Sequence, residues 1–533
     1  MKRLSWALAI VILFGAILRL TNLDGKLYWH DEAYTSLRIS GYTQAEVYQQ
    51  IFTGEVLPIA ALDRYQHPNS EKTWIDTFKT LAIDDPQHPP LYYVMVRGWV
   101  DLWGRSTSSI VRSFSALTSL LVLPAMYWLA HELFVQIEAG RQYLGSAKRS
   151  HADPKVRQTA CWFTVALVAV SPYHLLYAQE AREYALWALL TAISSALLLR
   201  SLRLRSRSSW IAYSISLILG LYTYLLMILV AIGHGIYVLL RERRLSRSLI
   251  AFGSAIVLSV LAFAPWLWLV VSTWSSTGAT WTATGSDRLI LLKLWGLSLD
   301  RAFVLTPSDF GFDSATVYFS LPVVLLLSAI ALYVVCRQTA FATWGFIVTL
   351  FAATFLPLAL PDFLIGGQRS AASRYLVPCY LALQLAIAFL LARWSRHNWG
   401  RAIAALVLSV SAIACVQATF ADTAWNKVIS YNNRPLAAII SQEPRPLLVT
   451  SSFAVNFGNL FALSDLLDRD VHLQLIFDLT NSKSAPIPTI DRNFDSVFLL
   501  NLNEQQRQAI EQQRQTSSQQ RFQDFHLSLW QLR

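Results

Sequence analysis

Long apolar segments separated by short polar links fill the first 420 residues of the chain. A helix that crosses a membrane needs about 20 mostly apolar residues, and this pattern predicts roughly eleven spans. They lie near residues 4–20, 110–134, 159–176, 185–200, 210–225, 226–240, 249–271, 316–336, 342–360, 375–392 and 402–419. Residues 210–240 are short for two spans, so a hairpin or one oblique helix is the alternative there.

The segment 90–103 is apolar but does not fit a span, because it is short and contains Arg97 and Asp101. Its tyrosines and tryptophans suit the membrane surface. We expect an amphipathic helix that lies flat at the outer interface. A span here would also place the basic link 135–158 outside, against the rule that basic loops stay in the cytoplasm.

Basic links set the orientation of the remaining spans. The arginine-rich links 200–209, 241–247 and 393–401 all fall on the cytoplasmic side when the N-terminus is cytoplasmic. Residues 1–20 resemble a signal peptide, but no small-residue cleavage site follows, so we expect an uncleaved first span. The loops 21–109 and 272–315 then lie outside the plasma (inner) membrane, and the protein is multi-pass.

The chain turns polar after residue 420. Short apolar runs at 447–450, 471–477, 496–501 and 525–532 predict strands, and residues 504–514 predict a helix. We therefore expect two domains: a multispan domain over 1–420, and a small soluble α/β domain over 421–533 on the outer side. The fold class is an all-α polytopic membrane protein with this small α/β domain at its C-terminus.

Composition agrees with this fold class. Hydrophobic residues make up 54% of the chain and charged residues 14%, which excludes a soluble protein. The formal net charge of +11 arises largely in the links between spans, so it indicates membrane topology and no nucleic-acid partner. All four cysteines lie in apolar segments, so no disulfide framework is expected.

The carboxylates of Asp31 and Glu32 follow the first span directly. Ionised groups near hydrocarbon are costly unless a site needs them, so this pair is the main catalytic candidate. The alternative is that both residues only stabilise the start of the helix that opens near Ala33, where acidic side chains are favoured.

Other candidates lie at the outer ends of later segments. Glu180 is the third catalytic candidate; its segment also carries Arg182 and Glu183, which as an alternative form a local ion pair at a helix start. Arg374 offers a forked set of donors suited to phosphate, or else it extends to lipid headgroups. The substrate-binding candidates are His88, Tyr92, Arg182, Arg369, Arg374 and Tyr375.

Four motifs in this order resemble membrane glycosyltransferases related to protein O-mannosyltransferases and to the transferases that add aminoarabinose to lipid A. This group is glycosyltransferase family 39-like and shares the multispan fold called GT-C. The motifs are WHDEAY (29–34), HPPLYY (88–93), QEAREYA (179–185) and RYLVP (374–378). The resemblance implies that Asp31 is the catalytic carboxylate, with Glu32 beside it, and that Glu180 belongs to the second acidic motif.

The resemblance also implies the reaction: a sugar on a polyprenyl phosphate is transferred, with inversion, to an acceptor hydroxyl at the outer face. A single carboxylate base suffices, because the phosphate leaves as an anion. Arg374, Arg182 or a divalent cation could stabilise that anion. Asp31, Glu32 and His88 are candidate ligands for Mg²⁺ or Mn²⁺, although no spacing defines a metal site.

Two other classes of protein fit parts of the pattern. A transporter or flippase of lipid-linked sugars also places charges along a membrane cavity, but it tends to place them near the midplane, among broken helices and repeats. A catalytically inactive envelope scaffold is the second alternative. The sequence leaves the donor sugar open, and the acceptor could be a lipid, a glycan or a protein.

Overall fold

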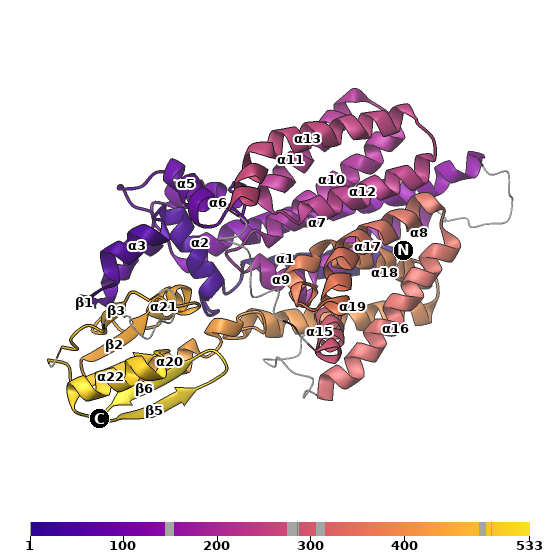
Figure 1. Cartoon of the computed structure of the whole chain (residues 1–533). Coiled ribbons are helices and arrows are strands. Elements are labelled where there is room, and N and C mark those ends of the chain that lie inside the picture. The colour runs from indigo at the N-terminus through magenta and orange to yellow at the C-terminus, as the bar shows by residue number, and fades with distance from the viewer. Residues whose placement is uncertain are drawn as a thin grey trace. The chain divides into compact units, whose positions relative to one another are not determined.

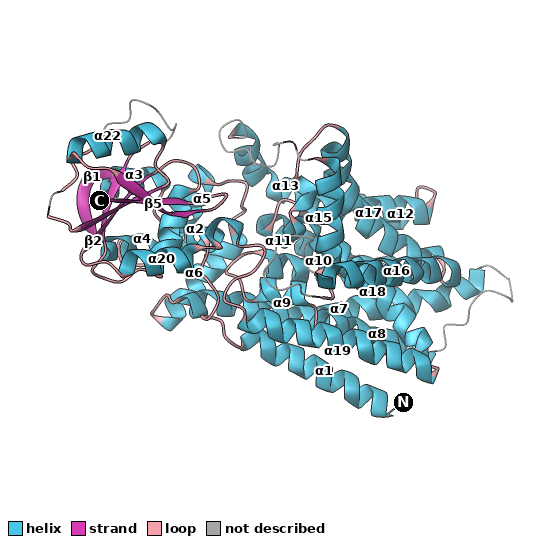
Figure 2. Ribbon diagram, turned by 90° about the horizontal axis from the view of Figure 1, so that it is seen from below, coloured by secondary structure: helices cyan, strands magenta, loops and turns pink. Residues whose placement is uncertain are grey.

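The computed structural model describes residues 2–143, 154–273, 285, 287–304, 315–478, 487–491 and 493–533. The chain is mostly helical and contains a small sheet (Figures 1 and 2). It forms two compact units. Unit 1 consists of residues 1–23, 86–92 and 112–421, and unit 2 of residues 24–85, 93–111 and 422–533. Residues 144–153 of the predicted basic link 135–158, and residues 274–284, 286 and 305–314 of the predicted loop 272–315, lie outside the described residues.

Unit 1 is a bundle of helices, which Figure 1 labels along the chain. Helices occur at all the segments for which spans were predicted, including two separate helices within 210–240. They are α1 (Lys2–Leu20), α7 (Ser108–Tyr143), α8 (Pro154–Ala169), α9 (Pro172–Ala178), α10 (Tyr184–Leu204), α11 (Arg207–Thr223), α12 (Met227–Glu242), α13 (Arg247–Ser272), α15 (Arg288–Asp300), α16 (Ala315–Gln338), α17 (Phe341–Leu364), η3 (Arg369–Ala371), η4 (Ser373–Leu376), α18 (Val377–Trp394) and α19 (Asn398–Phe420).

The lengths of these helices fit a multi-pass membrane protein. Among the described residues, seven helices are long and apolar enough to cross a membrane, or eight if the bent pair α8 and α9 counts as one span. Helices α11 and α12 have only 17 and 16 residues. The apolar surface of α13 and α16 is largely exposed, whereas α18 is almost completely buried. A helix that is apolar all round and buried is the core of such a bundle.

Helices α8 and α9 meet at an angle of 58°. Pro172 opens α9, and Ser171 caps it through its hydroxyl group. The last carbonyl groups of α8 lack partners within the helix. Arg19 of α1 supplies them: its guanidinium donates to the carbonyl oxygens of Ala169 at 2.5 Å and Val168 at 2.8 Å. Specific side-chain contacts therefore stabilise the bend between α8 and α9.

Unit 2 combines the loop after α1 with the polar C-terminal region. Its elements are α2 (His30–Ser40), α3 (Gln44–Ile51), β1 (Thr53–Pro58), η1 (Ile59–Leu62), α4 (Asp63–Gln66), α5 (Trp74–Asp84), most of α6 (Leu91–Trp103), η5 (Val428–Ser430), α20 (Asn433–Ser441), β2 (Pro446–Ser451), α21 (Asn456–Ser464), β3 (His472–Ile476), β4 (Ser496–Leu500), α22 (Glu504–Arg514), β5 (Ser518–Gln523) and β6 (Ser528–Leu532). Helix α6 forms where the amphipathic helix was expected.

The described strands form one six-stranded sheet in the order β1-β3-β2-β4-β6-β5. Strand β2 runs parallel to β3 and β4, and the other pairs are antiparallel. Side chains alternate between the two faces. Leu448 packs with α20 and α21 on one face, and Leu447 and Val449 pack with Ile510 of α22 on the other. Figure 2 shows α22 and α20 on opposite faces.

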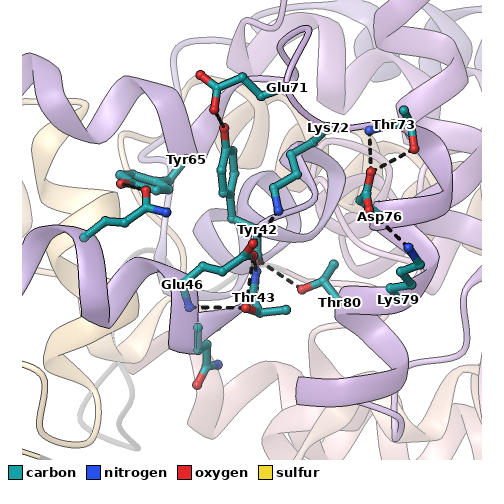
Figure 3. A network of polar contacts seen from close by, with 12 residues as sticks. Tyr42, Thr43, Glu46, Tyr65, Glu71, Lys72, Thr73, Asp76, Lys79 and Thr80 are labelled. Atoms are coloured by element: carbon teal, nitrogen blue, oxygen red, sulfur yellow. Dashed lines mark hydrogen bonds and ion pairs between the residues drawn. The ribbon is translucent and has the colours of Figure 1, made fainter.

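A polar network fixes the chain around α2, α3 and α5 (Figure 3). Thr43 caps α3 by exchanging hydrogen bonds with Glu46, and Lys72 Nζ lies 2.5 Å from Glu46 Oε1. Burial alone would raise the pKa of Glu46, but the hydrogen bonds from Lys72 and Thr43 hold it below its ordinary value. The Tyr42 hydroxyl donates to Glu71. These contacts give α2 a fixed support.

Candidate active site

Asp31 lies in the first turn of α2 with its side chain partly exposed, at 19%. The N-cap of this helix is Trp29, which makes no side-chain capping bond. Asp31 is thus not the capping residue, although an acidic group in a first turn is favourable. Its Oδ1 oxygen lies 3.3 Å from Nδ1 of His30. The backbone N–H of His30 donates to the Ser430 hydroxyl at 3.0 Å.

Glu32, the next residue, has different surroundings. Its carboxylate is fully buried and lies 2.9 Å from Nζ of Lys427, which is buried as well. The same ammonium group donates to the carbonyl oxygen of Leu27 at 2.6 Å and lies over the Trp29 ring. A buried carboxylate needs such a partner. Glu32 therefore ties the start of α2 to residues near 427, and Asp31 is the more accessible member of the pair.

Asparagine side chains hold the segment after Lys427 in place. The Ser430 hydroxyl donates to Oδ1 of Asn459 at 2.7 Å. Asn433 and Asn459 exchange amide hydrogen bonds of 3.0 and 3.1 Å. All of these side chains are buried. Buried polar networks that are satisfied in this way are rigid, so His30 and Asp31 rest on a fixed support within unit 2.

In unit 1, His88 and the motif 179–185 come together. Nε2 of His88 accepts a hydrogen bond from the Arg182 guanidinium at 2.9 Å and lies 3.8 Å from the Glu183 carboxylate. Glu183 is fully buried and pairs with Arg182 at 3.4 Å. Tyr92 is fully buried, and its hydroxyl bonds with Ser115 of α7 at 2.8 Å. The cluster thus contains His88 and Arg182, which were predicted to bind substrate, together with the Glu183 carboxylate.

Tyr177 links the motif 179–185 to the motif 374–378. Its hydroxyl bonds with the Ser373 hydroxyl at 3.3 Å, and it interacts electrostatically with Glu180, Arg374 and Arg301. Glu180 is buried. The guanidinium of Arg374 lies 5.5 Å from the centre of the neighbouring Tyr375 ring. Two arginines and a carboxylate therefore act electrostatically on one tyrosine.

Arg369 has a local role in the structure. Its guanidinium lies 3.0 Å from Oδ1 of Asp362, a buried carboxylate in the last turn of α17. The Ser370 backbone N–H and hydroxyl donate to the other oxygen of Asp362 at 2.6 and 2.8 Å. Arg369 therefore fastens η3 to the end of α17.

Asp300 is the last residue of α15 and Arg301 is its C-cap; both are buried. Burial lowers the pKa of Arg301 to about 10, so its guanidinium stays protonated. Burial raises the pKa of Asp300 to about 6, although the Ser320 hydroxyl at 3.0 Å and Arg301 act in the opposite direction. The Oδ1 oxygen of Asp300 has no hydrogen-bond partner among the described residues.

The described residues do not form a metal site from the predicted ligands. No group of three His, Cys, Asp or Glu side chains within the described ranges could hold a metal ion. Lys427 neutralises Glu32, so Asp31 and Glu32 do not present two available carboxylates.

No protein-family model matches the chain, and no curated protein matches its sequence. Its fold, however, matches that of ArnT from Cupriavidus metallidurans bound to undecaprenyl phosphate, with a TM-score of 0.53 and 13% identity over 98% of this chain and 96% of that one. The chain has the GT-C fold. The prediction made from the four motifs is thus confirmed for the fold.

Two further solved structures are less similar to the chain. The oligosaccharyltransferase of Archaeoglobus fulgidus in its apo form gives a TM-score of 0.48, with 12% identity over 86% of this chain and 64% of that one. The Pmt1-Pmt2 O-mannosyltransferase complex of S. cerevisiae gives 0.31, with 16% identity over 54% and 36%. Of these three values, the one for ArnT is high enough to establish a common fold.

Sequence reasoning missed two residues: Lys427, which pairs with Glu32, and Arg301, which interacts electrostatically with Tyr177. Lys427 is 395 positions from Glu32 in the sequence, and no local pattern relates the two. Arg301 is one of several charged residues in a long loop, and the sequence does not distinguish it from the others. Only the fold brings Lys427 to Glu32 and Arg301 to Tyr177.

Proposed function

We propose that the protein is an inverting glycosyltransferase that moves a sugar from a polyprenyl-phosphate donor to an acceptor hydroxyl at the outer face of the membrane. The observation that carries the proposal is the contrast between two adjacent carboxylates. Glu32 is buried and is neutralised by Lys427, whereas Asp31 is partly exposed beside His30. One accessible carboxylate on a rigid support is what a general base requires. The GT-C fold and the undecaprenyl phosphate bound to ArnT support the donor class.

In the proposed reaction, the acceptor oxygen attacks the anomeric carbon as the bond from that carbon to the phosphate oxygen breaks. The new bond forms on the opposite face of the sugar, so the configuration inverts. Asp31 takes the proton of the acceptor hydroxyl, and the polyprenyl phosphate leaves as an anion. No acid has to protonate this leaving group, in contrast to a glycosidase.

Arg374 and Arg301 are proposed to hold the donor phosphate, because both interact with Tyr177 and both are charged at neutral pH. Forked guanidinium donors match phosphate oxygens. Glu180, which interacts with the same tyrosine, is proposed to orient a sugar hydroxyl. Glu32 is proposed to act through Lys427 as a positioning residue for Asp31.

The outer-face location rests on the two ends of α10. Glu180 and Arg182 lie just before the helix, and Arg200 and Arg203 lie in its last turns. A helix of 21 residues is about 30 Å long, which is the thickness of a bilayer core. If the basic end is cytoplasmic, the end with the predicted motif is outside.

Cysteine labelling tests this orientation. In a background where the exposed Cys336 is serine, we expect a membrane-impermeant maleimide to label Arg445→Cys but not Arg244→Cys in intact cells. Both positions are exposed in the structure. Labelling of position 244 alone would reverse the proposed orientation.

The decisive experiment for function is Asp31→Asn. Transfer of a radiolabelled hexose or pentose from a polyprenyl phosphate to envelope material is measured with purified protein. Loss of the base should reduce turnover by about 10² to 10⁴, while donor binding and thermal unfolding stay unchanged. Because Asn preserves shape at a helix start, near-normal turnover would contradict the proposal. Asp76→Asn, in the first turn of α5, is the matched control and should retain activity.

The bend of 58° between α8 and α9 favours a second function, because transporters of lipid-linked sugars use broken helices. In that case the purified protein in vesicles moves a fluorescent polyprenyl-phosphate sugar between leaflets without any acceptor. Vesicle translocation that is unaffected by Asp31→Asn, together with no transfer, would support the transporter and exclude the transferase.

A further inference from the structure

A row of rings extends from His30, beside Asp31, across unit 2. The ring centres of His30 and Tyr34 are 5.0 Å apart, and those of Tyr34 and Phe457 are 5.9 Å apart. Phe457 and Tyr48 follow at 5.0 Å, and Tyr48 and Phe477 at 5.5 Å. We name these five side chains the aromatic row. Its members come from α2, α3, α21 and the end of β3.

Core packing alone does not account for the aromatic row. Phe457 is buried, but Tyr34 and Tyr48 are partly exposed and Phe477 is 47% exposed. Buried tyrosine hydroxyls normally find a partner. Among the described residues neither the Tyr34 nor the Tyr48 hydroxyl has a protein hydrogen-bond partner. Both hydroxyls are therefore available to a ligand.

Gly458 of α21 allows the row to form. A Cβ atom at this position would lie 2.6 Å from Cε2 of Tyr34 and 2.7 Å from Cδ2 of His30. The backbone of α21 thus supports the two rings nearest to Asp31 by direct contact, which fixes their orientation.

The charged side chains near the aromatic row determine which class of ligand it can bind. Tyr34 interacts electrostatically with Asp31 and Asp85, and Tyr48 interacts with Asp84. Arg38 is the cation that interacts with both tyrosines, and it is buried and paired with Asp84 at 2.6 Å and Asp85 at 3.9 Å. Three carboxylates thus act on the two tyrosines, against one guanidinium that is already paired. Such a surface repels phosphate and sulfate, and it offers acceptors to hydroxyl groups.

We propose that the aromatic row binds a neutral glycan, and that this glycan is the acceptor. Sugar rings have apolar C–H faces that stack on aromatic rings and hydroxyl edges that bond to carboxylates and tyrosines. The anionic donor does not suit this surface, whereas a neutral acceptor beside Asp31 does. The assignment as acceptor rests on the proposed transferase function, but the binding site itself does not.

Direct binding tests the site without requiring transfer. The full-length protein, in a detergent without a sugar headgroup, is titrated with linear tetrasaccharides of mannose, glucose, galactose and N-acetylglucosamine, each with and without a terminal phosphate. We expect at least one neutral tetrasaccharide to bind saturably and more tightly than its phosphorylated form. Absence of binding by all four, or preference for the phosphorylated forms, would overturn the proposal.

Variants localise the binding. Tyr34→Ala and Tyr48→Ala should each weaken binding about tenfold, as expected for a central aromatic contact. Tyr48→Phe keeps the ring and should weaken it only about threefold, which separates ligand contact from misfolding. Trp74→Ala removes an exposed ring of α5 outside the row and is the control. Unchanged binding by both alanine variants would contradict the assignment.

The Asp31→Asn variant separates this inference from the proposed function. It should still bind the tetrasaccharide, weakened at most about threefold because the Asn oxygen remains an acceptor, and fail to transfer sugar to it. Binding that depends on the row in a protein without any transfer activity would leave the glycan site in place and remove the transferase. Conversely, the protein could transfer sugar to an acceptor that itself contains no sugar, at a rate unaffected by Tyr34→Ala and Tyr48→Ala. That result would support the transferase and contradict the glycan site.

Discussion

The two ends of α10 carry the same kinds of charged side chain in opposite surroundings. At its C-terminal end, the buried Glu132 carboxylate of α7 accepts a hydrogen bond from Arg203 at 2.8 Å and lies 3.4 Å from Arg200. At its N-terminal end, the buried Glu183 carboxylate pairs with Arg182 at 3.4 Å. Arg200 and Arg203 are 44% and 33% exposed, whereas Arg182 is only 5% exposed.

The helix dipole distinguishes the two clusters. Cations are favoured at a helix C-terminus and disfavoured at an N-terminus, so Arg200 and Arg203 lie where a helix stabilises them. Arg182 lies at the unfavourable end and is buried there beside His88. Helix stability and membrane topology therefore explain the arginines at the C-terminal end of α10. Neither explains Arg182 at the N-terminal end. Position relative to the dipole distinguishes a candidate site from a stable helix end.

The largest expected effect is a loss of stability when the cluster at the N-terminal end of α10 is disrupted. Arg182→Met leaves Glu183 buried without its guanidinium partner, which typically destabilises a protein by about 3–5 kcal/mol. Thermal unfolding of the purified protein measures the loss. The double variant Arg182→Met with Glu183→Gln removes the uncompensated charge and should recover most of the stability. Equal stability of the single variant and the unaltered protein would show that the Arg182 guanidinium is not needed to stabilise the buried Glu183 side chain.

Asp300 extends the comparison to a buried carboxylate whose pKa is raised. Between its unfolded value of 3.8 and the folded value of about 6, the unfolded state loses the proton first, so stability falls as the pH rises through this range. The full penalty, at most about 3 kcal/mol, is present above pH 6. Asp300→Asn should remove this dependence, so its stability relative to the unaltered protein should rise between pH 4 and pH 7.5. A constant difference would exclude the raised pKa.

Most of the helical architecture could be predicted from the sequence, because apolar length and basic links are local signals. Strands β2, β3, β4 and β6 and helix α22 also lie at the predicted runs. Strand β1 was missed: its partner β3 lies more than 400 residues away, and residues 53–58 have a mixed burial pattern that no periodicity reveals. Strand β5 was missed because its sequence, SQQRFQ, is polar.

Some residues of the candidate site could likewise be predicted from the sequence, and others could not. Asp31, Glu180 and Arg374 could be singled out because charges beside apolar segments stand out. The difference between Asp31 and Glu32 could not be predicted, since it depends on Lys427, and the two carboxylates are adjacent in the sequence. The link from Arg301 to Tyr177 likewise requires α15 to be placed in the bundle.

Arg374→Lys sharpens the comparison on the donor side. A lysine retains the charge but cannot provide two parallel donors to a phosphate, so we expect the donor KM to rise about tenfold, which corresponds to about 1.4 kcal/mol, with kcat less affected. Lys293→Arg, in α15, is a control for altered charge geometry elsewhere in unit 1. An unchanged donor KM for Arg374→Ala would leave Arg374 as an interfacial anchor.

The smallest expected effect is at the C-terminal end of α10. Arg203→Gln removes one of two arginines near Glu132, and Arg200 remains within 3.4 Å of that carboxylate. Partly exposed ion pairs contribute about 0–1 kcal/mol, so thermal unfolding should shift little and sugar transfer should be normal. The same substitution at Arg182, Arg182→Gln, provides the contrast, with loss of both stability and transfer. If the two glutamine variants behaved alike, burial and dipole position would not distinguish the clusters, and Arg182 would be another helix-end charge. If only Arg182→Gln is impaired, the functional end of α10 is identified by an internal control in the same helix.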